Sequence, residues 1–163
     1  MVIIYKSDSG FTKRYAEMFA DKVGMECHSL HMARIKVSKK SDVIYFGRVI
    51  QGEVEDLKKA RKRYNVIAVC PVGLKMPTDA IKNELREKND IGDDCKMFYL
   101  RGGFDPEQNL GLEKTLINLI VSDLESQEEL DAVDSQYLND LKNGADYVRE
   151  INLQQLSLWY EEA

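Results

Sequence analysis

Residues 2–23 read VIIYKSDSGFTKRYAEMFADKV, and this stretch decides the fold class. It opens with the β-branched and aromatic run Val2–Tyr5, which predicts a short buried strand. Ser7–Gly10 follows with the residue types of a turn. From Phe11 onward, apolar side chains recur at intervals of three and four residues, which predicts an amphipathic helix ending near Gly24. Strand, loop and helix in this order begin a βαβ unit.

The same alternation continues along the chain. Four more apolar runs predict strands at Met25–His31, Asp42–Gly47, Val66–Cys70 and Lys96–Leu100. Helical spacing separates the later runs, and a long amphipathic helix is expected to carry Leu112 to Leu124. Strands that alternate with helices are typical of a parallel sheet covered on both faces. The predicted class is therefore α/β, a doubly wound parallel sheet of five strands.

The length of 163 residues suits one domain, and the composition of 44% hydrophobic and 31% charged residues is that of a globular protein. We place the sheet and its helices at about residues 1–124. Residues from about 125 to 163 are expected to form terminal helices that pack on the sheet. A separate helical domain of that size would be too small to be stable.

Charge and cysteine content exclude several classes of function. The 23 Lys and Arg against 28 Asp and Glu give a net charge of −5, which argues against a general nucleic-acid-binding surface. No apolar run approaches the ~20 residues that cross a bilayer, so no membrane span is expected. No secretory signal is visible, and Cys27, Cys70 and Cys95 are widely spaced, which favours reduced thiols in the cytoplasm. No metal site is predicted.

Three loops are expected at the carboxyl ends of the strands, where ligands bind open parallel sheets: residues 7–12, 47–53 and 71–78. The first offers three hydroxyls and the free N–H groups of a helix start, which suit a phosphate dianion. Neither G-x-x-x-x-G-K-[ST] nor G-x-G-x-x-G is present, so a P-loop and a dinucleotide-binding site are not supported.

The loop Ser7-Asp8-Ser9-Gly10-Phe11-Thr12 resembles the T/S-x-T/S-G-x-T loop that holds the FMN phosphate in the flavodoxin family. Tyr5–Ala16 and Tyr99–Asp105 are similar to the flavodoxin-domain branch that also contains the bacterial quinone-linked protoporphyrinogen oxidases. The resemblance implies a strand order of 2-1-3-4-5 and FMN as cofactor. It implies that the flavin ring lies against the second and third loops, at Gly47, Arg48, Val49, Ile50, Gln51 and Gly52 and at Pro71, Val72, Gly73 and Leu74.

Neither ring-binding loop contains the Trp or Tyr that commonly stacks on the flavin in this family, so a more exposed or weaker-binding flavin is expected. Arg48 is interpreted as a solvent-facing charge rather than a flavin contact. Arg101, Gly102, Gly103 and Phe104 are candidates for binding an acidic substrate or partner. The favoured alternative is a glycine turn that leads to an Asp105 cap with Pro106 at the first helical position, because Asp-Pro-Glu is good helix-start chemistry.

The leading functional hypothesis is an FMN protein that carries electrons between redox partners, either a partner protein or a small redox-active molecule. It requires no catalytic acid, base or nucleophile. One alternative is an FMN-dependent oxidase resembling the quinone-linked protoporphyrinogen oxidases, although no long insertion that could form a tetrapyrrole site is expected. The other is an interaction module that binds no flavin. The oligomeric state is not predicted.

Overall fold

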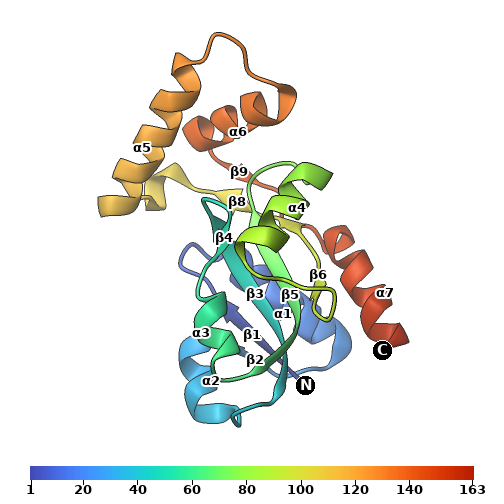
Figure 1. The fold of residues 1–163 in the computed structure, drawn as a ribbon. Helices are drawn as coiled ribbons and strands as arrows, with labels where there is room; N and C mark the ends of the chain where they lie inside the picture. The colour runs from blue at the N-terminus through green and yellow to red at the C-terminus, as the bar shows by residue number, and fades with distance from the viewer.

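The computed structural model describes residues 1–163, and a parallel sheet forms its centre (Figure 1). The principal strands lie in the order β2-β1-β3-β5-β6. Their bounds are β1 Val2–Lys6, β2 Cys27–Ser29, β3 Asp42–Ile50, β5 Asn65–Gly73 and β6 Lys96–Met97. Counted along the chain, these are the five strands of the predicted order. The prediction of a doubly wound, flavodoxin-like α/β fold is therefore confirmed.

Helices cover both faces of the sheet. Ile3 and Ile4 are both fully buried but lie in different core clusters, because successive side chains of a strand point to opposite faces. On the Ile3 face pack α1 (Phe11–Val23) and α7 (Gln154–Glu162). On the Ile4 face pack α2 (Leu30–Lys36), α3 (Leu57–Arg61) and α4 (Asp79–Lys88).

The second strand is shorter than expected. The Ser29 side chain accepts a hydrogen bond from the backbone N–H of Met32, so it caps α2 directly after Cys27–Ser29. Sequence reasoning assigned Met25–His31 to a strand and missed this helix. The helix exposes Ile35 and buries Leu30 and Ala33, a weak pattern for so short an element.

The second of the three predicted loops is mostly strand. β3 continues through Ile50 and turns back at Gln51 and Gly52 into β4 (Glu53–Val54), which pairs antiparallel with it. Both turn residues have positive φ, 49° and 80°, as a tight hairpin turn requires. The loop predicted at residues 47–53 is thus a hairpin that extends from the carboxyl end of the central strand β3.

The fifth strand is broken opposite Pro71. β6 pairs with Ala68 and Val69, and the chain pairs again only at β7 (Leu100–Arg101), opposite Val72 and Gly73. Pro71 has no N–H to donate, so the ladder has a natural gap at this position. The break frees Tyr99, whose hydroxyl donates to the Lys75 carbonyl at 2.6 Å, to line a cavity described below.

An insertion separates the sheet from the last helix. β8 (Gly103–Phe104) pairs antiparallel with β9 (Ala145–Asp146), and between them lie η1 (Pro106–Gln108), α5 (Gly111–Ser126) and α6 (Ala132–Asn143). Figure 1 shows α5 and α6 packed against each other beyond the end of the sheet. No helix in the structure is both long and apolar enough to cross a membrane.

The chain returns to the core after this insertion, through η2 (Glu150–Leu153) and α7. Val148, Leu153 and Leu156 belong to the same buried cluster as α1, whereas Leu124 is the only buried residue of α5. The structure therefore divides the chain differently from the boundary expected at residue 124. The end of the chain completes the sheet packing, and the helix at 111–126 lies outside it.

Candidate functional site

The first loop presents free donors at the start of α1. Gly10 has a positive φ of 96° and donates its N–H to the Ser7 hydroxyl at 3.1 Å. The first helical hydrogen bond runs from Arg14 to the Gly10 carbonyl. The N–H groups of Phe11, Thr12 and Lys13 have no acceptor within the chain. These donors and the positive end of the helix dipole suit an anion.

Asp8 in this loop is neutralised by a neighbouring lysine. Lys6 Nζ lies 2.6 Å from Asp8 Oδ1, and this hydrogen bond lowers the pKa of Asp8 and raises that of Lys6. The carboxylate therefore does not leave an uncompensated negative charge beside the helix start.

Arg48 joins three carboxylates. Its guanidinium lies 2.7 Å from Glu113 Oε1 on α5, 3.4 Å from Glu55 Oε2 and 3.5 Å from Asp8 Oδ2. Its side chain is 21% exposed. The interpretation of Arg48 as a solvent-facing charge is therefore wrong, because the insertion brings Glu113 over the end of β3. Burial raises the pKa of Glu55, with Arg48 opposing the shift.

A small polar cavity of about 90 Å³ lies beside this arginine, lined by Asp8 and Ser9 of the first loop, by Phe104 and by the start of the insertion. Two buried atoms here lack a hydrogen bond, Arg48 Nε and the Asn109 side-chain oxygen. Asn109 is 7% exposed and lines the cavity. Arg48 Nε faces Glu55 Oε2 at 3.4 Å, so the Asn109 oxygen is the unsatisfied atom beside the cavity that suits a ligand hydroxyl as donor.

An apolar cavity of about 300 Å³ adjoins the polar one and shares Arg48, Phe104 and Glu113 with it. The end of β3 and Leu74 form one wall. The insertion forms the other, through Leu112, Leu116, Ile117 and Ile120 of α5 and Tyr137 and Leu141 of α6. The volume lies at the lower end of the range for small-molecule sites, and the lining is mostly apolar as such sites require.

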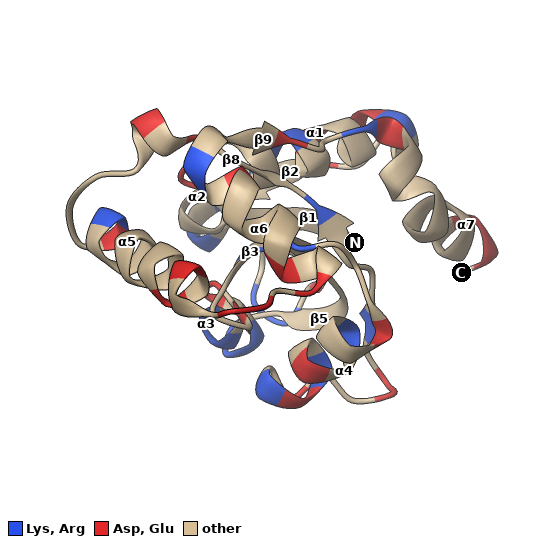
Figure 2. Ribbon diagram, turned by 90° about the horizontal axis from the view of Figure 1, so that it is seen from above, with Lys and Arg blue, Asp and Glu red and all other residues tan.

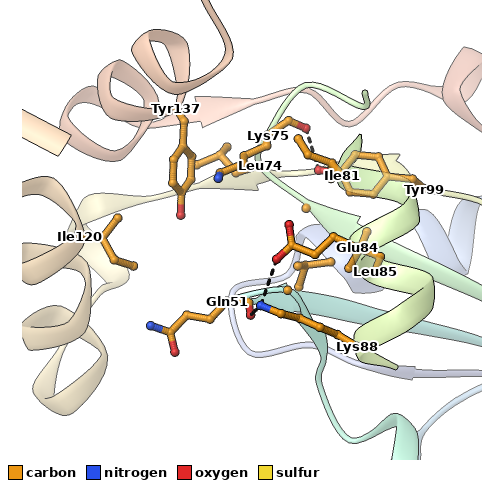
Figure 3. Close-up of a pocket in the computed structure, with 13 residues that line it drawn as sticks. Gln51, Leu74, Lys75, Ile81, Glu84, Leu85, Lys88, Tyr99, Ile120 and Tyr137 are labelled. Atoms are coloured by element: carbon orange, nitrogen blue, oxygen red, sulfur yellow. Dashed lines mark hydrogen bonds and ion pairs between the residues drawn. The ribbon is translucent and has the colours of Figure 1, made fainter. Parts of the chain in front are cut away.

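A third cavity of about 330 Å³ shares Val49, Leu74 and Tyr137 with the apolar one. Figure 3 shows it between α4, which contributes Ile81, Glu84, Leu85 and Lys88, and the insertion, which contributes Ile120 and Tyr137. Lys75 Nζ lies 4.8 Å from the centre of the Tyr137 ring. Because neighbouring cavities share lining residues, the three together form a path along the carboxyl edge of the sheet, from the first loop to α4.

Most of the sequence-predicted residues meet on this path. Those that line a cavity are Asp8, Ser9, Arg48, Val49, Ile50, Gln51, Gly52, Val72, Gly73, Leu74, Gly103 and Phe104. Ser7, Gly10 and Thr12 lie at the adjoining helix start. The Phe11 ring packs instead against Gly103. A Cβ added to Gly103 would lie 2.5 Å from that ring.

Four further predicted residues lie off the path. Gly47 and Pro71 are paired with each other inside the sheet, and a Cβ on Gly47 would lie 2.6 Å from the Val54 side chain. Gly102 is buried against Val72. Arg101 lines a separate polar pocket. The Asp105 cap and Pro106 are present as expected, although they begin the short η1 rather than the long helix.

The aromatic residues of the site were missed by sequence reasoning. Tyr137 and Tyr99 line the cavities although neither belongs to the two predicted ring-binding loops. Burial raises the pKa of both phenols, so both are neutral donors at physiological pH. Tyr137 was placed only in a helix-like C-terminal segment, and no local signal distinguishes an aromatic residue that faces a cavity from one that faces a core.

A buried polar cluster holds α6 to the sheet. The Arg101 guanidinium lies 3.6 Å above the Tyr147 ring, and the Tyr147 hydroxyl donates to Asp140 at 2.9 Å. Asp140 is 3% exposed, and its Oδ2 lies 3.7 Å from Arg101 Nη2. This cluster fixes the insertion at one end, as Arg48 and Glu113 do at the other.

The sheet, its covering helices and the ligand-sized path at the carboxyl edge define the chain as a doubly wound α/β protein of flavodoxin-like architecture. No protein-family model matches the chain, and no curated protein sequence matches it.

Proposed function

We propose that this protein binds FMN along the connected path and carries electrons between redox partners. The order of the chemical environments along the path is the observation that carries the proposal. Free N–H donors at the start of α1 are followed by an unsatisfied polar atom and then by an apolar cavity. This order matches the phosphate, the ribityl hydroxyls and the ring of FMN.

Each part of the chain then has a definite role. The N–H groups of residues 11–13 and the Ser9 hydroxyl hold the phosphate, with Lys6 balancing Asp8. Arg48 and Asn109 face the ribityl hydroxyls. The flavin itself supplies the one- and two-electron chemistry, and the protein supplies binding, orientation and electrostatics.

The apolar face of α5 supports this placement. Leu112 lines the apolar cavity and is 90% exposed, although apolar surface is costly to leave in water. A planar ring in the cavity would cover Leu112, and Phe104 and Tyr137 would contact the ring. These two aromatic residues supply what the predicted loops lack.

An oxidase remains the second candidate, and the cavity at α4 favours it. A carrier needs one ring site, whereas a second cavity that shares Tyr137 with the first leaves room for a substrate beside the flavin. The sequence showed no long insertion that could form a tetrapyrrole site, whereas residues 105–144 form an insertion whose helices line the cavities. Three free cysteines also support the proposed cytoplasmic location, where thiols stay reduced.

The test begins with the purified protein. We expect a flavin absorption spectrum and release of FMN on denaturation. The double variant Ser9→Asp with Thr12→Ala should lose the flavin, since a fixed carboxylate repels the phosphate. Ser38→Asp adds the same charge on an exposed residue between α2 and β3 and should retain it.

A colourless protein that cannot be reconstituted with FMN would support the flavin-free interaction module instead. If flavin is bound, turnover of protoporphyrinogen with a quinone separates the oxidase from the carrier. Retention of FMN by the double variant would show that the phosphate lies elsewhere.

A further inference from the structure

A polar pocket of about 400 Å³ lies next to the path but differs from it in character. It shares Tyr99 with the cavity at α4 and none of that cavity's aliphatic residues. The other lining residues are Pro77, Arg101, Tyr147, Arg149 and Asn152. Two guanidinium groups therefore line one concave surface that no carboxylate lines.

The guanidinium of Arg101 is held in place, but not all of its N–H groups have a hydrogen-bond acceptor. Tyr147 covers its guanidinium, and its Nε donates to the Leu74 carbonyl at 3.3 Å. Its Nη atoms make no hydrogen bond within the chain, and the 3.7 Å separation from Asp140 is too long for one. The side chain is 18% exposed, so these donors are already held at the pocket and would lose little conformational entropy on binding.

Arg149 supplies the second cation. One of its nitrogens donates to the adjacent Val148 carbonyl at 2.7 Å, and no carboxylate lies within 4.0 Å of its guanidinium. The nearby acids have other partners: Asp146 pairs with Arg14 at 2.8 Å, and Glu150 pairs with Lys22 at 3.9 Å. Arg149 therefore forms no ion pair within 4.0 Å, in a protein with a net charge of −5.

We propose that this pocket binds the carboxylate or phosphate group of a small molecule between Arg101 and Arg149. The planar guanidinium matches both oxyanions with paired hydrogen bonds. The side-chain amide of Asn152 donates both of its hydrogens, to the Tyr15 hydroxyl and to the Tyr147 carbonyl. The two arginines are therefore the donors that recognise the anion. The proposal stands on these residues alone and does not require bound flavin.

The test is a titration of the full-length, isotope-labelled protein followed by NMR. Succinate and inorganic phosphate are the two probes, and sodium chloride at matched ionic strength is the reference. We expect saturable shifts of the backbone amides of residues 147–152 and 99–102. Phosphate bound at the first loop would instead shift residues 10–13, so the two sites are read separately.

Arg149→Ala is the deciding variant, since its side chain is exposed and its removal leaves the core intact. Affinity for the anion should fall at least about tenfold, equivalent to ~1.4 kcal/mol. The affinity of Arg149→Lys should lie between those of the parent and Arg149→Ala, because lysine keeps the charge but lacks the planar guanidinium. Arg34→Ala removes an exposed arginine on α2 and should bind as the parent protein does.

The relative affinities of succinate and phosphate identify the group that the pocket prefers. The proposal is overturned if neither anion shifts residues 147–152 beyond the chloride reference, or if Arg149→Ala binds as tightly as the parent. A failure of FMN binding leaves these outcomes unchanged, because they are measured without flavin.

Discussion

The guanidinium of Arg48 lies 2.7 Å from the carboxylate of Glu113, 65 residues further along the chain. This contact joins the central strand β3 to α5 and closes the insertion over the carboxyl edge of the sheet. Figure 2 shows acidic residues distributed over α5 and α6 as they lie across this edge. Arg48 is therefore one of the cations that tie an acidic insertion to the sheet, together with Lys75 and Arg101, and its part of that closure depends on the carboxylates around it.

Glu55, the most buried of the three carboxylates around Arg48, gives the first prediction. Its pKa is raised by burial above the ordinary value of 4.5, so ionised Glu55 disfavours the folded state. Its contribution to stability therefore declines as the pH rises from about 4.5 through the raised folded pKa. Glu55→Gln should become progressively more stable relative to the parent across that window, as measured by urea unfolding at several pH values.

Glu53→Gln is the matched control for this measurement. Glu53 is exposed on the neighbouring strand and forms no ion pair, so the variant removes a carboxylate without affecting Arg48. An equal pH dependence in the two variants would contradict the role assigned to Glu55.

The hydroxyl of Tyr147 gives the second prediction. Tyr147→Phe removes the donor that satisfies Asp140, which is 3% exposed. Leaving a buried acceptor unsatisfied costs about 1–3 kcal/mol, and urea unfolding should show a loss in that range. Tyr160→Phe removes a hydroxyl that makes no hydrogen bond within the chain, on a ring that packs edge-on against Phe19, and should change stability little. Equal effects would show that the hydroxyl of Tyr147 does not stabilise the insertion.

The third prediction concerns which helix completes the core. Leu156 on α7 is 0% exposed, whereas Leu119 on α5 is 63% exposed. Leu156→Ala should cost about 2–5 kcal/mol of unfolding free energy through lost burial and a residual cavity. Leu119→Ala should stay within about 0.5 kcal/mol. The reverse order would place α5 rather than α7 against the sheet.

The fourth prediction concerns Tyr137 and depends on FMN binding. Tyr137→Ala removes an aromatic ring from the apolar cavity and from the cavity at α4, and an aromatic contact is worth about 0.5–1.5 kcal/mol beyond its buried area. The dissociation constant for FMN should therefore rise by roughly two- to twelvefold, as measured by flavin fluorescence. Tyr137→Phe keeps the ring and should bind FMN as the parent does. Unchanged affinity in the alanine variant would remove Tyr137 from the ring site.

The local elements were the most predictable part of the structure. Hydrophobic periodicity and turn residues within residues 2–23 predicted the first strand, its loop and α1, because each of these elements depends on neighbours in sequence. The break opposite Pro71 was not anticipated, since it arises from the pairing of two strands. The strand extensions beyond Gly47 and Cys70 were missed for the same reason.

The candidate site divides in the same way. The first loop and the ends of β3 and β5 were identified because parallel strands bring their carboxyl ends to one edge. Asn109, Glu113, Tyr99 and Tyr137 reach that edge only through the insertion and the strand break. Arg149 meets Arg101 only because β9 returns the chain to β8.

By itself, the sequence determined the fold class and the strand, loop and helix of residues 2–23, since hydrophobic period and helix-start chemistry are local properties of the chain. The order of the strands was implied by the family resemblance and is confirmed by their pairing. Only the tertiary structure decided which helix covers the sheet and which covers the site. The apolar pattern of α5 suits either position, because amphipathicity states that one face must be covered but not by what. Long-range pairs such as Arg48 with Glu113 and Arg101 with Tyr147 settle that choice through contacts that no local pattern encodes.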